Sequence, residues 1–584
     1  MQTKSIRLKV AAAALFLLAI APAAEAALSV EQRLSDYGQL VSIVKRSYGP
    51  LRWKKESIGL DFAKLTTDFE TRVRAVKSDA EFYRTLSAFL SSLKDGHTKG
   101  VIPSNYTGSL GFVADLVAGK VLIESVDTLK LPSVIFPFKR GDEVIAIGDR
   151  PVAQLIDELS QINHNGNEAS TRRIAAARLT VRREAAGFEV PKGITTVTVL
   201  PAGAKQPVTV SLTWNNTGSP LVELDDLGAV LEDQANEGSA TSGEDSFAEA
   251  IAKSSFANLA LPKATRDDFA RIGLSDMGSP KSVFTLPEGA RVLDKLPITA
   301  AIYQAAGKRI GVLRIHSYMD DGLLEALKRA LIEMEQETDV LVLDQTYNPG
   351  GSVSLVSKIV GLFADKSYRD MNFVVRPSLN WMESFRGLSD KADETLAKNS
   401  QDVVANVLKG RFEYLEGEVR SAIEQKRFYT APFSLDLTGA GYGMIQPNAS
   451  VRYTKPVLLL INELDFSGGD EFPALMKDNG RVTLFGAQTA GAGGNVNEYG
   501  PLANSYFKFN LTESLMVRPN GQFVENRGIV PDVAYAITED DFNNGYRGYV
   551  AAFTKEALKL TGMSDAEIAE GTKPAVAGLS IIRR

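Results

Sequence analysis

The stretch whose residues are best suited to catalytic chemistry is 462–472, which contains a serine followed by two glycines, Ser467-Gly468-Gly469. The apolar run 456–461 before it predicts a buried strand, and the amphipathic run 470–476 after it predicts a helix. Ser467 is therefore expected at a strand-to-helix turn. Such a turn presents a hydroxyl for nucleophilic attack and directs the first N–H groups of the helix toward an oxyanion. A serine before glycine is also an ordinary helix N-cap, so this stretch alone leaves both interpretations open.

Two further turns carry residues suited to chemistry. His97 lies in the turn Asp95-Gly96-His97 directly after a predicted helix, where its side chain can point into a cleft. The segment 344–351 (Asp-Gln-Thr-Tyr-Asn-Pro-Gly-Gly) follows a predicted strand, and its two glycines suit either a plain turn or a loop of oxyanion donors. Of the other two histidines, His164 is predicted to be exposed to solvent and His316 to be packed or hydrogen-bonded.

The N-terminus has the three parts of a secretory signal peptide. A basic start (Lys4, Arg7, Lys9) precedes the apolar stretch 10–20 and the small-x-small site 24–26. We expect cleavage after Ala26 and an exported bacterial protein, either periplasmic or secreted. No later apolar run is long enough to span a bilayer, so we expect a soluble mature chain with peripheral or no membrane contact.

The composition excludes several classes of function. Loss of residues 1–26 removes three Lys or Arg and one Glu, so the net charge falls from −6 to −8 (−6 − 3 + 1). An acidic chain is a poor partner for nucleic acid. The absence of cysteine excludes disulfides, thiolate metal sites and a cysteine nucleophile, and three histidines leave little scope for a metal site. We therefore predict neither a metal nor a cofactor.

Hydrophobic periodicity divides the chain into successive regions. The alternation of strands and helices in 296–545 predicts a layered α/β domain. The polar stretch before it, 216–295, is predicted to be either a flexible linker or a lid or pro-segment. In order, we expect a signal peptide (1–26), a helical region (27–107), a β-rich domain (108–215), the insertion (216–295), the α/β domain (296–545) and a C-terminal helix and tail (546–584).

The β-rich region resembles a PDZ domain. Ser109-Leu110-Gly111-Phe112 is similar to the carboxylate-binding loop of that family, and 140–152 is similar to its G-D-x-I strand. The resemblance implies that an extended peptide is captured by strand addition, with the N–H groups of Leu110, Gly111 and Phe112 around its carboxylate. Residues 162–188 interrupt the pattern, which leaves open whether the groove is altered.

Four segments resemble motifs of the S41 serine peptidases, the family of tail-specific (carboxyl-terminal processing) and tricorn-type proteases. They are 344–351, the Ser467 turn, 486–491 and 528–532, and with the PDZ-like region the resemblance covers most of 90–545. It implies an S41-type catalytic domain with a ClpP/crotonase-like α/β fold. It also implies a serine peptidase that acts on proteins or peptides.

The family divides by its catalytic base. One branch uses a lysine in a T-x-G-K-G segment, but 489–493 has Ala492 at that position. The other branch uses a histidine in a D-x-H turn, which His97 and its neighbours resemble. A chlamydial branch with a Ser-His-Glu arrangement is similar at the serine turn, in 489–494 and in 523–526, and on that resemblance Glu525 is the third member. Other carboxylates on the same β-rich stretch are Glu498, Glu513 and Asp532. A relative in that branch is a homodimer after self-processing, which implies a possible homodimer here.

These residues together make a chemically consistent hypothesis. A serine hydroxyl needs an adjacent base, and a histidine titrates close enough to neutrality to accept and return its proton. A carboxylate would fix the histidine tautomer, while Gly468 N–H and one of Gly350 or Gly351 would hold the oxyanion. Asp344 is expected to orient the glycine loop. The alternative is a catalytically silent S41-like protein that binds peptides or apolar ligands, as interphotoreceptor retinoid-binding proteins do.

Overall fold

The computed structural model describes residues 27–221, 258–260, 262–274, 276–293, 295–320, 322–436 and 443–572. The predicted signal peptide and the polar centre of the insertion lie outside these ranges. Within the ranges, no helix combines the length and the apolar composition that a bilayer crossing requires.

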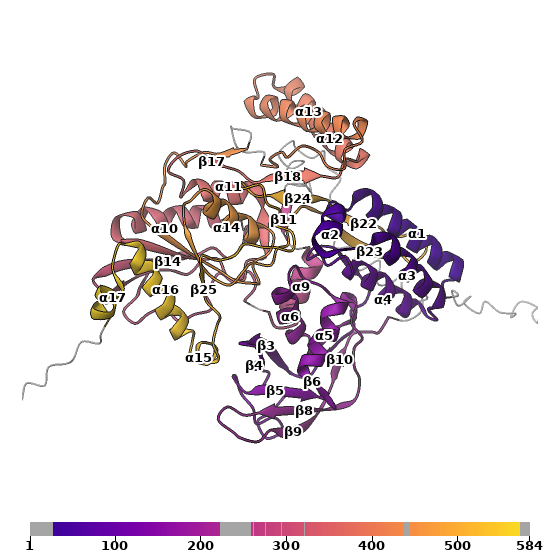
Figure 1. Cartoon of the computed structure of the whole chain (residues 1–584), viewed down its shortest axis with the longest axis horizontal. Helices are drawn as coiled ribbons and strands as arrows, with labels where there is room; N and C mark the ends of the chain where they lie inside the picture. The colour runs from indigo at the N-terminus through magenta and orange to yellow at the C-terminus, as the bar shows by residue number, and fades with distance from the viewer. Residues whose placement is uncertain are drawn as a thin grey trace, which may run out of the picture.

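A seven-stranded sheet forms the largest unit of the chain, with the strand order β12-β13-β14-β15-β20-β21-β25 (Figure 1). The strands from β14 to β25 are parallel, and β12 to β14 are antiparallel. Their bounds are Arg291–Val292, Ala300–Ala305, Lys308–Arg314, Val340–Asp344, Val457–Ile461, Thr483–Gly486 and Val533–Ala534.

Helices cover both faces of this sheet, and the alternation of side chains in the strands shows which residues face which helices. Leu341 and Leu343 of β15 pack with α10 (Leu323–Glu337), α11 (Val353–Gly361) and α14 (Gly468–Asp478). Val340 and Val342 pack on the opposite face with α16 (Arg547–Leu560). Helix α16 lies in the C-terminal region 546–584, where a helix is expected, and it covers the second, apolar face of the sheet.

The PDZ-like region is an antiparallel sheet with the order β3-β4-β5-β8-β9 and two helices packed against it. The interruption at 162–188 is a structured part of this unit, since it supplies α6 and β7. The bounds are β2 Thr107–Ser109, β3 Phe112–Val117, β4 Lys120–Val126, β5 Glu143–Ile147, β6 Arg150–Pro151, α5 Val152–Ile162, α6 Glu168–Ala177, β7 Val181–Arg183, β8 Ile194–Leu200, β9 Val208–Thr213 and β10 Asn215–Thr217.

The N-terminal helices do not form an isolated bundle. They pack on a small sheet, β1-β23-β22, in which β1 comes from the N-terminal region and the other strands from the C-terminal part of the chain. This packing joins the N-terminal helices and the segment 502–511 in one core (Figure 1). The bounds are α1 Val30–Ser47, α2 Leu51–Ile58, α3 Phe62–Ala75, α4 Asp79–Ser91, β1 Lys99–Val101, β22 Val496–Tyr499 and β23 Lys508–Thr512.

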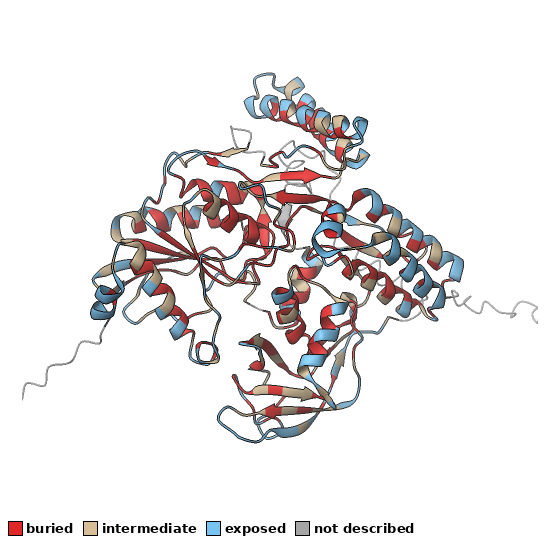
Figure 2. Ribbon diagram, in the orientation of Figure 1, coloured by how far each residue is buried: buried red, intermediate tan, exposed pale blue. Residues whose placement is uncertain are grey.

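The remaining elements surround the large sheet. A helical hairpin, α12 and α13, projects at the top of Figure 1, and its outer faces are the exposed ones in Figure 2. The bounds are β11 Asn258–Ala260, α9 Lys263–Arg271, β16 Gly350–Ser352, β17 Tyr368–Arg369, β18 Asn372–Val375, α12 Leu379–Lys398, α13 Val403–Glu424, β19 Met444–Ile445, β24 Ser514–Val517, α15 Glu539–Asn543 and α17 Asp565–Gly571.

Candidate active site

Ser467 lies between the end of β20 and the first residue of α14. Its backbone has φ 61° and ψ −111°, a conformation that non-glycine residues adopt at an energetic penalty and mostly at functional turns. Its N–H donates to Asp470 Oδ2 at 3.0 Å, which holds the turn. The side chain is fully buried, and its Oγ makes no hydrogen bond to another protein group. Ser467 stands at the N-cap position of α14, but its Oγ does not accept the hydrogen bond from a backbone N–H of the first turn that a side-chain cap requires.

The glycines predicted to hold an oxyanion lie directly against this turn. A Cβ atom at Gly468 would lie 3.1 Å from Gly351 N and 3.3 Å from Gly350 Cα. A Cβ atom at Gly351 would lie 2.0 Å from the Tyr318 carbonyl carbon, so only glycine fits there. Gly350 N–H already donates to Asn348 Oδ1 at 2.9 Å. This bond leaves Gly351 and Gly468 as the better candidates for oxyanion donors.

Part of the insertion lies on the same glycine loop. Strand β11 pairs antiparallel with β16, so that Leu259 is opposite Gly351 and Ala260 is opposite Gly350. Helix α9 follows, and its Phe269 ring lies 6.0 Å from the ring of Phe466, the residue before Ser467. The described part of the insertion therefore covers the candidate oxyanion loop and the serine turn.

His97 lies in a turn that is fixed by Asp95. The Asp95 carboxylate accepts the N–H groups of His97 (2.8 Å) and Thr98 (3.2 Å) and the hydroxyl of Tyr48 (2.8 Å). The His97 ring is fully buried, and neither ring nitrogen bonds another protein group. Burial lowers the pKa of His97 to about 4. The imidazole is therefore neutral at pH 7, the form that a general base requires.

The loop 491–493 contacts the three candidate catalytic positions. Gly491 and Ala492 donate their N–H groups to Asp470, the same carboxylate that accepts Ser467 N–H. A Cβ atom at Gly96, next to His97, would lie 2.8 Å from Ala492 Cβ. Gly493 N–H donates to Glu525 Oε2 at 3.2 Å. The loop in which related enzymes carry a lysine base here serves to gather the serine, the histidine and the glutamate.

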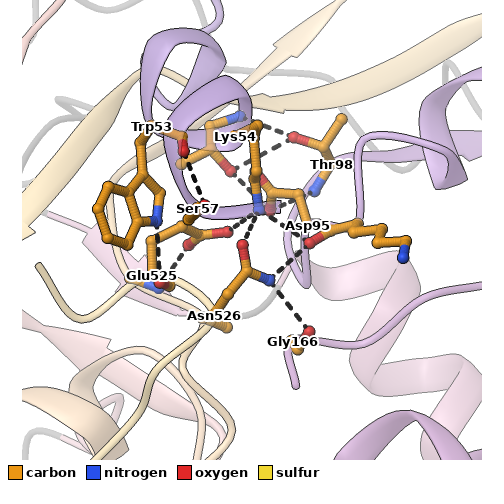
Figure 3. Close-up of polar contacts among 12 residues, drawn as sticks. Trp53, Lys54, Ser57, Asp95, Thr98, Gly166, Glu525 and Asn526 are labelled. Carbon is orange, nitrogen blue, oxygen red and sulfur yellow. Dashed lines mark hydrogen bonds and ion pairs between the residues drawn. The ribbon is translucent and has the colours of Figure 1, made fainter. Parts of the chain in front are cut away.

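Glu525 is fully buried, and Lys54 is its ion-pair partner (Figure 3). Lys54 Nζ lies 2.5 Å from Glu525 Oε1, and Gly493 N–H occupies Oε2. Burial raises the pKa of the Glu525 carboxyl, and Lys54 is the strongest influence in the opposite direction. Among the described residues, no hydrogen bond links Ser467 to His97 or His97 to Glu525. The structure thus gathers the three residues around one loop without connecting their side chains.

The other carboxylates on the β-rich stretch have partners elsewhere. Glu498 pairs with Lys508 at 3.4 Å, and Glu513 accepts hydrogen bonds from Asn497 and Tyr499. Asp532 accepts Leu484 N–H at 2.9 Å and pairs with Lys477. None of these carboxylates bonds the imidazole of His97.

Neither of the two remaining histidines hydrogen-bonds the hydroxyl of Ser467. His164 is half-buried, which corrects the prediction that it is exposed, because its N–H donates to Ser91 and its carbonyl accepts from Lys99. His316 is buried, with its Nε2 3.5 Å from Asp320.

Asp344 orients the glycine loop as predicted. Its Oδ1 accepts the N–H (3.1 Å) and the hydroxyl (2.7 Å) of Thr346 and pairs with Arg314 at 3.0 Å. All of these groups are buried.

The PDZ-like loop uses its N–H groups within the fold. Leu110 N–H donates to Thr180 O at 2.9 Å, and Gly111 N–H donates to Ser109 Oγ at 3.0 Å. A Cβ atom at Gly111 would lie 2.8 Å from Leu131. In this conformation two of the three predicted donors (Leu110, Gly111 and Phe112) are therefore not free to receive a peptide carboxylate.

A cavity of about 390 Å³ lies apart from the serine, between the PDZ-like sheet and the carboxyl ends of β15, β20 and β21. Its aromatic lining includes Tyr347, Tyr535, Tyr546 and Tyr549, and none of the candidate catalytic residues lines it. Cavity volume alone does not locate this active site. Within the described ranges, no three His, Asp or Glu side chains are arranged to hold a metal ion.

Sequence reasoning places Lys54 in the helical region 27–107 but assigns it no role. Two local signals mark its helix: Pro50 stands at the N-cap of α2, and Gly59 ends the helix in the left-handed conformation with φ 69°. The pairing of Lys54 with Glu525 has no local signal, since 471 positions separate the two residues.

Two parts of the chain match known protein families. Residues 309–535 match the sequence profile of "Peptidase family S41", and residues 106–221 match that of "PDZ domain". A protein of Chlamydia pneumoniae is 27% identical over 587 residues, which cover 92% of this chain and 91% of its own. A carboxy-terminal-processing protease of Bartonella bacilliformis is 27% identical over 120 residues, 20% of this chain and 26% of its own.

The fold also matches a solved structure. Mature CPAF in complex with lactacystin superposes with a TM-score of 0.73, at 22% identity, over 91% of this chain and 99% of that chain. The predicted order of a helical N-terminus, a PDZ-like domain and an S41-type α/β domain is confirmed. The family match assigns residues 309–535 to peptidase family S41, and this chain is a serine peptidase.

Proposed function

We propose that this chain is an exported serine endopeptidase in which Ser467 is the nucleophile, His97 the general base and Glu525 the third member of the triad. The observation that carries the proposal is the geometry of Ser467. Its strained backbone presents a buried hydroxyl without a protein partner beside two glycines, and the separate loop 491–493 connects this turn to the His97 turn and to Glu525. A helix-capping or packing role explains none of these features.

The proposed reaction follows from these groups. Ser467 Oγ attacks the scissile carbonyl carbon while the neutral His97 takes its proton. The N–H groups of Gly468 and Gly351 stabilise the oxyanion, and His97 then returns the proton to the leaving amine. Water, activated by His97, hydrolyses the acyl-enzyme. The carboxylate of Glu525 stabilises the imidazolium that forms in each half-reaction.

We infer that the described conformation is a latent one. Strand β11 lies along the edge of β16, where an extended substrate would present its scissile bond to the glycine loop. Catalysis also requires hydrogen bonds from Ser467 to His97 and from His97 to Glu525, which this conformation does not contain. These two features support a role of 216–295 as a restraining pro-segment, one of the two possibilities that its composition leaves open.

Export remains a proposal that rests on the signal peptide pattern of 1–26. It predicts that the mature chain begins at Ala27 and is found outside the cytoplasm. A homodimer is likewise a prediction, which light scattering after size-exclusion chromatography tests directly.

The proposal is tested with Ser467→Ala in the full chain. Hydrolysis of unfolded casein should fall by about 10⁴-fold or more, as expected when a catalytic nucleophile is removed. Self-cleavage within 216–295 should occur in the wild type and be absent in the variant. The matched control is Ser160→Ala, which removes another buried hydroxyl without a protein partner, in the PDZ-like domain. Near wild-type hydrolysis by Ser467→Ala would exclude Ser467 as the nucleophile, whereas no hydrolysis by the wild type would favour the silent ligand-binding alternative.

A further inference from the structure

Helix α2 of the N-terminal region reaches the segment that carries Glu525 (Figure 3). Two adjacent residues of this helix, Trp53 and Lys54, are buried and contact 523–527. A long-range contact of this kind places part of the catalytic geometry under the control of a helix outside the catalytic domain.

Trp53 holds the backbone of this segment. Its indole Nε1–H donates to the carbonyl of Glu525 at 3.1 Å. Its ring packs edge-to-face against Phe523 at 5.2 Å between centroids, and the Arg527 guanidinium lies over the ring at 4.7 Å. The indole thus contacts Phe523 before Glu525 and Arg527 after it. These contacts hold the backbone from which the Glu525 carboxylate projects.

Lys54 makes three contacts with its ammonium group. Nζ lies 2.5 Å from Glu525 Oε1, 2.5 Å from Asn526 Oδ1 and 2.8 Å from Lys94 O. An ammonium has three N–H donors, so all of its hydrogen-bonding capacity is used. Both charged side chains are 0% exposed, which makes the pair sensitive to the loss of either partner.

The third of these acceptors, the carbonyl of Lys94, connects Lys54 to the turn that carries His97. Lys94 stands three positions before His97, and its carbonyl also accepts a hydrogen bond from Asn526 Nδ2 at 2.8 Å. Asn526 has φ 60°, so its side chain is aimed by an unusual backbone conformation. Lys54 and Asn526 therefore join the turn that carries His97 to the loop that carries Glu525.

We propose that Lys54 is a positioning residue for catalysis, which favours the ionised form of the Glu525 carboxyl and fixes the His97 turn against the Glu525 loop. The inference rests on the proposed triad, because Lys54 acts only through Glu525 and His97. A purely structural staple would stabilise the fold and leave the pH dependence of the reaction unchanged.

The charges around Glu525 predict the direction of that pH dependence. Burial raises the pKa of the Glu525 carboxyl, Lys54 lowers it, and Asp95 raises it. The Tyr48 hydroxyl, whose own pKa is raised by burial and by Asp95 and Glu525, faces the same group. Removal of Lys54 takes away the largest opposing influence and leaves the hydrogen bond from Gly493 N–H against burial and Asp95, so the pKa of Glu525 must rise further. As the pH falls, activity that needs the ionised carboxylate is therefore lost at a higher pH in a variant without Lys54 than in the wild type.

The experiment compares Lys54→Met, Lys54→Arg and the control Lys55→Met in the full chain. Lys55 is the next residue of α2 and is exposed, so its loss removes an equal charge without touching the site. With unfolded casein as substrate, kcat of Lys54→Met should fall by about 100-fold at pH 7, with an unchanged KM. This loss is smaller than the ~10⁴-fold loss that follows when the carboxylate of a triad is replaced. The acid limb of kcat should move to higher pH. Lys54→Arg, which keeps the charge, should recover part of kcat and the wild-type limb.

Two comparisons separate this inference from the proposed triad. Activity in Glu525→Gln at the wild-type level would exclude Glu525 as the third member and would overturn the role of Lys54 with it. If Glu525→Gln is inactive while a folded Lys54→Met has the wild-type kcat and pH profile, the proposed triad is retained and only the positioning role of Lys54 is excluded. If Lys54→Met does not fold, Lys54→Gln takes its place, because the amide keeps a donor for Lys94 O while the charge is lost. A wild-type pH profile in Lys54→Gln would equally overturn the inference.

Discussion

The serine side of this site (Ser467) and the base side (His97 and Glu525) are held in position in different ways. Ser467 is positioned by one continuous strand–turn–helix, with β20 before it and α14 after it. His97 and Glu525 stand on segments that lie far apart in the chain and are held by Lys54 and by the loop 491–493. The nucleophile therefore depends on local backbone geometry, whereas the base depends on how distant regions pack. Substitutions on the two sides should consequently fail in different ways.

The largest effect is expected where the two sides meet. Asp470 accepts the N–H groups of Ser467, Gly491 and Ala492 and the hydroxyl of Thr489, all of them buried. Asp470→Ala should lower the free energy of unfolding by about 3–5 kcal/mol, because several buried donors lose their acceptor. Urea unfolding measures this loss. The control is Asp393→Ala, an exposed carboxylate on α12, which should change stability by less than about 1 kcal/mol. Equal losses in the two variants would contradict the role of Asp470 as the link.

A smaller effect, confined to the serine side, is expected from Gly468→Ala. The added Cβ would lie 3.1 Å from both Gly351 N and Tyr318 Cδ2, so the oxyanion donors must shift apart by a few tenths of an ångström. We expect kcat to fall by about 100-fold, the effect of impairing one oxyanion donor. Gly387→Ala in α12 is the matched control, since a Cβ atom added there would meet no other atom within 4 Å. Unchanged kcat in Gly468→Ala would remove this glycine from the oxyanion site.

The smallest effect concerns the base side and is a pH dependence of stability. Burial lowers the pKa of His97 from 6.5 to about 4, so the unfolded chain binds more protons than the folded chain between these values. The free energy of unfolding therefore rises with pH in this window, with a contribution from His97 of at most about 1.4 kcal/mol per pH unit. His97→Asn should reduce that slope in urea unfolding between about pH 4.5 and 6.5. An unchanged slope would show that His97 is not buried in its neutral form.

The same contrast explains how much could be predicted from the sequence. The serine turn, the strand before it and the helix after it are encoded by neighbouring residues, so 456–476 reveals them. The family resemblance and the serine peptidase activity are confirmed, since the motifs that carry them are short and continuous. The assignments of Ser467, His97 and Glu525 stay predictions.

The unpredicted features are all products of long-range packing. Helix α2 is short, and the apolar pattern around it gives no reason to expect that Lys54 would be buried against Glu525. The pairing of β11 with β16 depends on a three-residue strand that no periodicity can identify. The partial burial of His164 arises from contacts with Ser91 and Lys99, which come from other elements. In each case the deciding partner is remote in sequence.

The central claim is that Ser467 is a nucleophile activated by His97, and covalent labelling tests it most directly. The protein, produced from the full chain, is treated with a fluorophosphonate probe, and the adduct is located by peptide mass spectrometry. The account predicts one adduct, on Ser467, that is absent in Ser467→Ala and forms at least about 10³-fold more slowly in His97→Ala. An adduct on another residue, or equal labelling rates with and without His97, would contradict it.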